Sequence, residues 1–94
     1  MIINVNSSGI KIDVSASETL TTIFGTPHAV IPVGNIASFK IDPSHPLGEV
    51  VEVIDKNGDE YAILYTSIES INDIVTTVSA LDAFEKISLA LFNL

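Results

Sequence analysis

Residues 49–66 read EVVEVIDKNGDEYAILYT, and this stretch decides the fold. Two runs rich in β-branched residues flank the dipeptide Asn57-Gly58. Asn-Gly between two such runs is the strongest short-range signal for a β-hairpin, because both residues tolerate the positive φ angles of tight turns. A pattern typical of helices comes directly after it. The hairpin is therefore predicted to join a β half of the chain to a helical half.

The hairpin can form in two registers that differ by one residue. With a two-residue loop, Asp55 lies opposite Glu60, and such a like-charge pair destabilises a sheet. If Gly58 instead takes the left-handed position of a three-residue loop, Val53 faces Tyr61, which sets an aromatic residue beside a β-branched one. This register also sets Asp55 against Asp59 at the mouth of the loop, so we favour the three-residue loop only slightly.

Five shorter runs upstream of the hairpin are also predicted as strands. They cover residues 2–5, 10–14, 19–24, 29–33 and 36–42. The first two are expected to pair as a hairpin, since turn-forming residues separate them. The fourth run contains Pro32, which cannot donate to a ladder, so this strand should lie at a sheet edge or end there.

Helical patterning begins after the hairpin. Thr66 and Glu69 have the spacing of a capping box, which predicts a helix from residue 67. Ser79 and Asp82 form a second possible cap. The segment is therefore either one long helix or two helices broken near Ser79. A single helix over 67–92 would be about 39 Å long, so it would bend or project beyond a domain of this size.

The predicted fold is α+β, with about seven mostly antiparallel strands in a small barrel or sandwich followed by a C-terminal helical segment. At 94 residues the chain is expected to be a single domain. Residues 1–66 form the β half and residues 67–94 the helical segment.

The C-terminal end is unusually apolar. Residues 87–94 read ISLALFNL and carry no charge. This end either tucks under the sheet as core or is buried against another copy or a different protein, since large apolar patches on a surface usually mark interfaces. In the second case the residues expected to form the interface are Leu81, Phe84, Ile87, Leu91 and Phe92.

The charge of the chain argues against several partners. Twelve acidic residues against four lysines give a formal charge of −8, and there is no arginine. Such a chain repels phosphates, which argues against direct binding to nucleic acid or to an anionic membrane. Five acidic residues gather on the hairpin: Glu49, Glu52, Asp55, Asp59 and Glu60. They either protect the strand pair from aggregation or offer a negative surface to a basic partner.

No pattern points to catalysis, a cofactor or a metal. The chain has no cysteine, and it lacks the G-x-S-x-G elbow and glycine-rich phosphate loops. Residues 55–66 begin like a calcium loop, but Glu60 replaces the required glycine and Thr66 the bidentate glutamate. His28 and His45 lack the spacing of a helical metal pair. We therefore expect a protein that is not an enzyme.

The segments IPVGNIASFKID (31–42) and VVEVIDKNGDEYAILYT (50–66), with a capped helix after them, resemble the later half of pleckstrin-homology-like small β-barrels. The resemblance implies a helix that closes one end of the barrel. Lipid-binding members use a basic first loop, whereas residues 6–9 here read NSSG with only Lys11 nearby, so inositol-lipid binding is not implied. The composition also resembles that of small bacteriophage proteins.

The leading hypothesis is a non-enzymatic structural or interaction module that self-associates through its C-terminal helix, for example a virion or assembly component. The alternative is an acidic inhibitor or regulator that binds the basic site of a nucleic-acid-processing protein. The sequence shows neither a signal peptide nor a run of about 18 apolar residues, which predicts a cytoplasmic or virion-associated protein.

Overall fold

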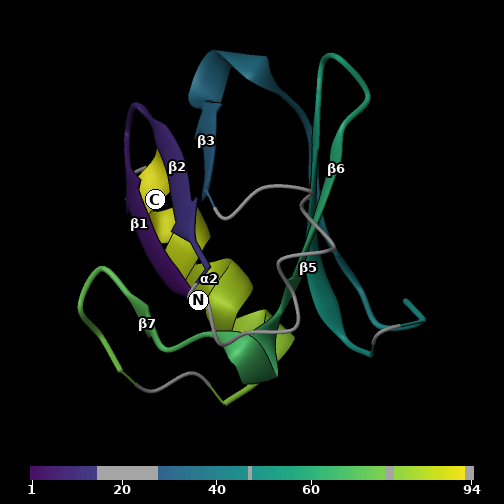
Figure 1. The fold of residues 1–94 in the computed structure, drawn as a ribbon, viewed down its shortest axis with the longest axis vertical. Helices are drawn as coiled ribbons and strands as arrows, with labels where there is room; N and C mark the ends of the chain where they lie inside the picture. The colour runs from purple at the N-terminus through teal and green to yellow at the C-terminus, as the bar shows by residue number, and fades with distance from the viewer. Residues whose placement is uncertain (15–27, 47, 76–77, 93–94) are drawn as a thin grey trace.

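Seven strands form two sheets in the part of the chain that the computed structural model describes, residues 1–14, 28–46, 48–75 and 78–92 (Figure 1). The first sheet has the order β3-β2-β1-β7 and the second the order β4-β5-β6. The strands are β1 (Ile2–Asn6), β2 (Gly9–Asp13), β3 (His28–Pro32), β4 (Ile36–Asp42), β5 (Val50–Asp55), β6 (Glu60–Leu64) and β7 (Ser70–Ile71). Helix α2 (Ala80–Phe92) comes after them. The predicted α+β class is confirmed.

The first sheet contains the hairpin predicted near the N-terminus. Strands β1 and β2 pair antiparallel, with Ile3 opposite Ile12 and Val5 opposite Ile10. These four side chains are buried, and their neighbours along each strand point away from the core, as the alternating pattern requires. Strand β3 lies at the edge of this sheet, as predicted from Pro32.

The second sheet contains the central hairpin in the register of the three-residue loop. Val53 pairs with Tyr61, and Gly58 has a φ of 89°. The loop is stabilised by Asp55, whose carboxylate accepts the backbone N–H groups of Asn57 and Asp59, each at 2.9 Å. Because the acidic side chain serves as a turn acceptor, it is buried inside the loop, and the backbone N–H of Asp55 donates to the carbonyl of Asp59 across the loop at 3.0 Å.

Residues 65–75 differ from the prediction. The helix expected from residue 67 is absent; instead Tyr65–Ser67 form a single 3₁₀ turn and Ser70–Ile71 form strand β7, which pairs parallel with β1. The backbone N–H of Glu69 donates to the carbonyl of Met1 at 2.7 Å. The open edge of β1 supplies hydrogen-bond partners that outweigh local helical patterning, so the boundary placed at residue 66 was wrong.

The second predicted cap is confirmed. The hydroxyl of Ser79 accepts the N–H of Asp82 at 3.0 Å, so Ser79 is the N-cap of α2. The 13 residues of the helix span about 20 Å, which matches the sheets it packs against. The predicted strand over residues 19–24 lies outside the described residues.

Asn72 fastens the end of β7 to β1. Its side-chain oxygen accepts the N–H of Val5 at 2.7 Å, and its side-chain amide donates to the carbonyl of Val5 at 2.9 Å. Its own N–H donates to the carbonyl of Ile3 at 2.9 Å. Asn72 has a φ of 49°, in the left-handed region that asparagine tolerates better than most residues. The side chain thus extends the parallel ladder past the point where the backbone turns away.

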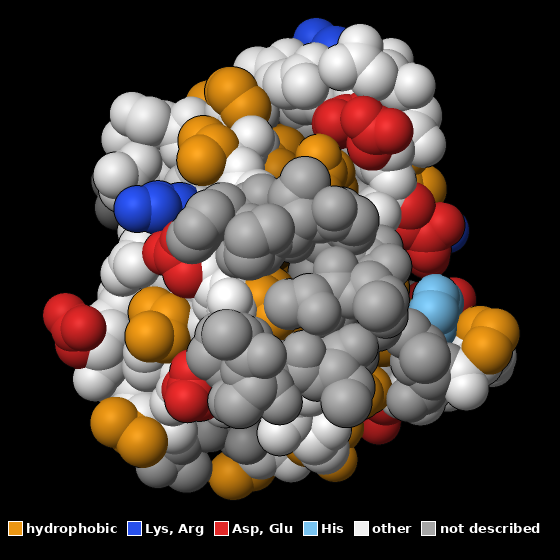
Figure 2. Space-filling view, in the orientation of Figure 1, with side chains coloured by type: hydrophobic (Ala, Val, Ile, Leu, Met, Phe, Trp, Pro, Cys, Tyr) orange, Lys and Arg blue, Asp and Glu red, His pale blue; other side chains and the backbone are white. Residues whose placement is uncertain are grey.

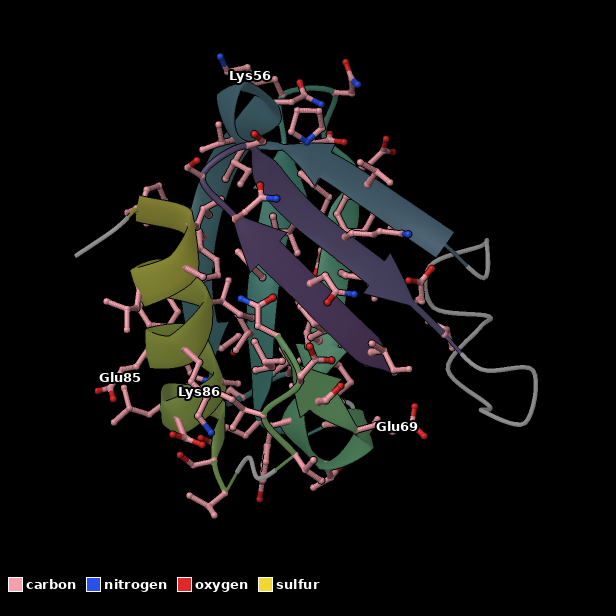
Figure 3. The ribbon with its side chains drawn as sticks, turned by 90° about the vertical axis from the view of Figure 1, so that its left-hand side faces the viewer. Lys56, Glu69, Glu85 and Lys86 are labelled. Carbon is pink, nitrogen blue, oxygen red and sulfur yellow. The ribbon has the colours of Figure 1, made fainter. Side chains whose placement is uncertain are left out.

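One hydrophobic core joins the two sheets and the helix. The sheets face each other, and α2 lies along one side of both, as Figures 1 and 3 show. Ile3 and Ile12 enter the core from the first sheet, Val53 and Ile63 from the second. The helix contributes Ala80, Ala83, Ile87 and Leu91.

Candidate interaction surface

The residues predicted to form an interface separate into two groups. Ile87 and Leu91 are 0% and 3% exposed and belong to the core of the chain itself, so we correct the prediction for them. Phe84 is half-buried and stacks on Phe39 with ring centroids 4.5 Å apart. Leu81 and Phe92 are 53% and 46% exposed. The tail is therefore core on one side and surface on the other.

The outward side of α2 carries a stripe of three apolar and two polar residues, which we call the α2 face. It consists of Leu81, Glu85, Ser88, Leu89 and Phe92, at intervals that bring them to one side of a helix. Glu85 points away from both sheets in Figure 3. This face is mainly hydrophobic. Even so, its apolar side chains Leu81, Leu89 and Phe92 are each at least 46% exposed among the described residues.

Apolar side chains also lie exposed between β7 and α2, and we call the three residues Ile74, Val75 and Val78 the connector. All three are more than half exposed. With Leu81, Leu89 and Phe92 they make six exposed large apolar side chains, whose exposed areas add up to roughly 600 Å². Sequence reasoning missed the three residues of the connector, because helical spacing assigns Val75 and Val78 to a buried helix face.

A hollow of about 190 Å³ lies beside the α2 face. Its lining consists of Ile71, Asn72, Ile74, Lys86, Leu89 and Ala90. Lys86 bridges to Asp82 one turn earlier at 3.0 Å. This hydrogen bond holds the pKa of Asp82 below its ordinary value, with a smaller effect of the N–H of Val78 in the same direction. The Lys86–Asp82 ion pair, which forms within the chain, thus lies at the border of the α2 face.

The five acidic residues of the hairpin do not form one surface. Glu52 and Asp55 are buried, and Glu52 pairs with Lys40 at 3.5 Å. Glu49 and Asp59 are exposed, while Glu60 lies 3.7 Å from His45. The face in Figure 2 likewise shows acidic side chains in several separate groups. Two of the five residues of the predicted acidic surface, Glu52 and Asp55, are therefore buried within the chain and cannot face a partner.

The pKa of Tyr61 is affected by the buried carboxylate of Asp55. Burial raises the pKa of Tyr61, and the negative charges of Asp55 and Asp59 raise it further. A hydrogen bond to Asp55 acts in the same direction, because it stabilises the protonated phenol. Asp55 thus links the loop to strand β6, which is a structural role for a residue that the sequence also offers as a binding group.

We also searched the described residues for a metal site, a membrane-spanning helix and a second hollow. No three His, Cys, Asp or Glu side chains gather there in a way that could hold a metal ion. Within the same ranges, no helix is long and apolar enough to cross a membrane. A second hollow, of about 290 Å³, lies on the outer side of the first sheet above Gly9. Asn4, Asn6, Lys11 and Val30 are among the residues that line it.

No protein family, curated protein or solved structure matches this chain. The resemblances to pleckstrin-homology-like domains and to small bacteriophage proteins therefore stay predictions. Any function inferred for the chain rests on the α2 face and the connector.

Proposed function

We propose that this protein is a non-enzymatic interaction module that self-associates through the α2 face and the connector, as a structural component of an assembly such as a virion. The observation that carries the proposal is the apolar area of roughly 600 Å² formed by six exposed side chains. This area is at the upper end of what monomers expose in one patch, and such patches are often functional surfaces.

A second copy is the partner that suits this area. Two such patches in contact would bury roughly 1,200 Å² in total, which is the lower end for specific protein interfaces. The net charge of −8 on each copy opposes association through long-range repulsion. Self-association should therefore become tighter as salt is added, because salt screens the repulsion and leaves apolar contacts intact.

The experiment is sedimentation equilibrium on the full chain and on a Leu81→Asp/Leu89→Asp variant. We expect the unaltered chain to form dimers or larger species and the variant to be monomeric at the same concentration. The matched control is Val30→Asp, since Val30 is 68% exposed on β3, outside the proposed surface. Circular dichroism should show all three proteins folded. A chain that stays monomeric into the high micromolar range would refute the proposal.

The acidic-inhibitor hypothesis makes the opposite salt prediction, since attraction to a basic partner weakens as salt is added. With Glu52 and Asp55 turned inward, only Glu49, Asp59 and Glu60 of the predicted surface remain to face such a partner. No observation favours it over self-association.

A further inference from the structure

We propose that Asn57 is a site of spontaneous deamidation, and that the hydrogen bonds made by Asp55 control how fast it reacts. The inference is independent of the proposed self-association, because the loop between β5 and β6 belongs to neither the α2 face nor the connector. It derives from the residue that follows Asn57, from the exposure of the loop and from the hydrogen bonds that hold the loop backbone.

The residue after each asparagine distinguishes Asn57 from the others in the chain. Asn57 precedes a glycine, whereas the other five precede a residue with a side chain: Asn4, Asn6, Asn35, Asn72 and Asn93. A side chain on the following residue hinders its backbone nitrogen from approaching the asparagine carboxamide, and glycine has none. The sequence therefore makes Asn57 the asparagine most open to attack by its own backbone.

The structure leaves the Asn57 side chain accessible. Lys56, Asn57 and Gly58 are all exposed, and Lys56 marks the tip of the hairpin at one end of the molecule in Figure 3. Within the part of the chain that the structure describes, no hydrogen bond engages the Asn57 side chain. Asn72 is exposed as well, but two hydrogen bonds to Val5 hold its side chain. The Asn57 carboxamide can therefore rotate toward the peptide group that follows it.

The nucleophile in this reaction is the backbone nitrogen of Gly58. After losing its proton, this nitrogen attacks Cγ of Asn57; the new N–Cγ bond closes a cyclic imide and the Cγ–Nδ2 bond breaks. The side-chain nitrogen leaves as ammonia and takes up a proton in place of the one that Gly58 lost. One water molecule then opens the imide at either carbonyl, which gives aspartate or isoaspartate without any oxidant or reductant. Either product adds one negative charge to the formal charge of −8.

Asp55 holds the loop in a conformation that opposes this attack. The N–H of Gly58 donates to the backbone carbonyl of Asp55 at 3.0 Å, so the attacking nitrogen keeps its proton in the closed loop. The carboxylate of Asp55 accepts the N–H groups of Asn57 and Asp59 at 2.9 Å each, which fixes the backbone on both sides of Gly58. Reaction therefore requires the loop to open, and exposed loops open far more often than a core unfolds. Loss of the carboxylate should make that opening more frequent, because hydrogen bonds to a charged acceptor are the stronger ones.

Peptide mapping by mass spectrometry after incubation at mildly alkaline pH measures the conversion at each asparagine. The test variant is Asp55→Ala, which removes both bonds of the carboxylate. The control variant is Ser79→Ala, which removes the N-cap of α2 and so weakens the fold without touching the loop. Asn6 is an internal control, because it also lies exposed at the end of a hairpin strand but precedes Ser7.

We expect Asn57 to lose its amide before any other asparagine in the unaltered chain. Asp55→Ala should raise the rate roughly tenfold, since the loop then lacks two hydrogen bonds to a charged group. Ser79→Ala should leave the rate within about twofold, because local opening does not depend on the stability of α2. An unchanged rate in Asp55→Ala, or equal acceleration by Ser79→Ala, would overturn the control by Asp55.

The site itself is tested against the chain unfolded in urea. If Asn57 of folded Asp55→Ala keeps its amide for as long as the unfolded chain needs to lose it, Asn57 is not a deamidation site of the folded protein. Should Asp55→Ala fail to fold, hydrogen exchange of the unaltered chain replaces it. The N–H of Gly58 must then exchange at least about tenfold faster than the slowest amides of β5. Exchange as slow as theirs would overturn the proposal.

Discussion

Replacing Asn72 removes the connection between β7 and β1, and the structure allows its effect on stability to be worked out. The side chain makes two hydrogen bonds to the backbone of Val5, at 2.7 and 2.9 Å, in a partly buried setting. Each such bond contributes about 0.5–1.5 kcal/mol net, and a buried group left unpaired costs about 1–3 kcal/mol. Water can reach part of this site, so we expect Asn72→Gly to lower the free energy of unfolding by about 2 kcal/mol.

Asn72→Ala should be more destabilising than Asn72→Gly. Alanine loses the same two hydrogen bonds, but it must also adopt the φ of 49° that Asn72 has in the structure. For a residue with a Cβ this left-handed conformation costs about 1 kcal/mol or more, whereas glycine adopts it freely. The expected loss for Asn72→Ala is therefore about 3 kcal/mol, and the difference between the variants combines the backbone strain of alanine with the greater unfolded-state entropy of glycine.

Urea unfolding followed by circular dichroism measures both variants. With a slope of about 1–3 kcal/mol per molar urea, a loss of 2 kcal/mol moves the midpoint by roughly 1 M. Ser7, which lies in the exposed turn of the first hairpin, offers a control in Ser7→Ala. A loss below about 0.5 kcal/mol for Asn72→Gly would mean that water replaces the side chain fully. In that case the connection between β7 and β1 would not depend on Asn72.

Three further changes test other parts of the fold. Gly9→Ala would place a Cβ 2.3 Å from a carbonyl oxygen of β3, so we expect a midpoint at clearly lower urea, while Gly34→Ala meets nothing within 4 Å and should have little effect. Ser79→Ala removes the N-cap of α2 and should lower stability by about 1 kcal/mol in the same assay. The raised pKa of Tyr61 favours the folded state below the ordinary tyrosine pKa near 10, and this contribution disappears as pH rises through the higher folded-state value. Ultraviolet titration should show Tyr61 ionising at lower pH in Asp55→Asn than in the unaltered chain; an unchanged pKa would contradict the assigned link.

The sequence determined those features that depend on neighbouring residues. Gly58 supplies the positive φ that a three-residue loop needs, and the unfavourable opposition of Asp55 and Glu60 slightly disfavours the other register; the structure has the three-residue loop. Ser79 caps α2 because its hydroxyl reaches an N–H three residues later, within one turn. These interactions form inside short segments, so nearby residues indicated both as alternatives before the structure decided between them.

Only the tertiary structure decided the conformation of residues 65–75 and the side of α2 that is exposed. Thr66 and Glu69 fit a capping box, yet the unpaired edge of β1 draws this segment into a parallel strand. The tail could have been wholly core or wholly interface by composition. Its burial was settled by the space beside the two sheets, which admits Ile87 and Leu91 and leaves Leu81 and Leu89 outside. Contacts between residues far apart in the sequence determine both outcomes, and a local pattern carries no information about them.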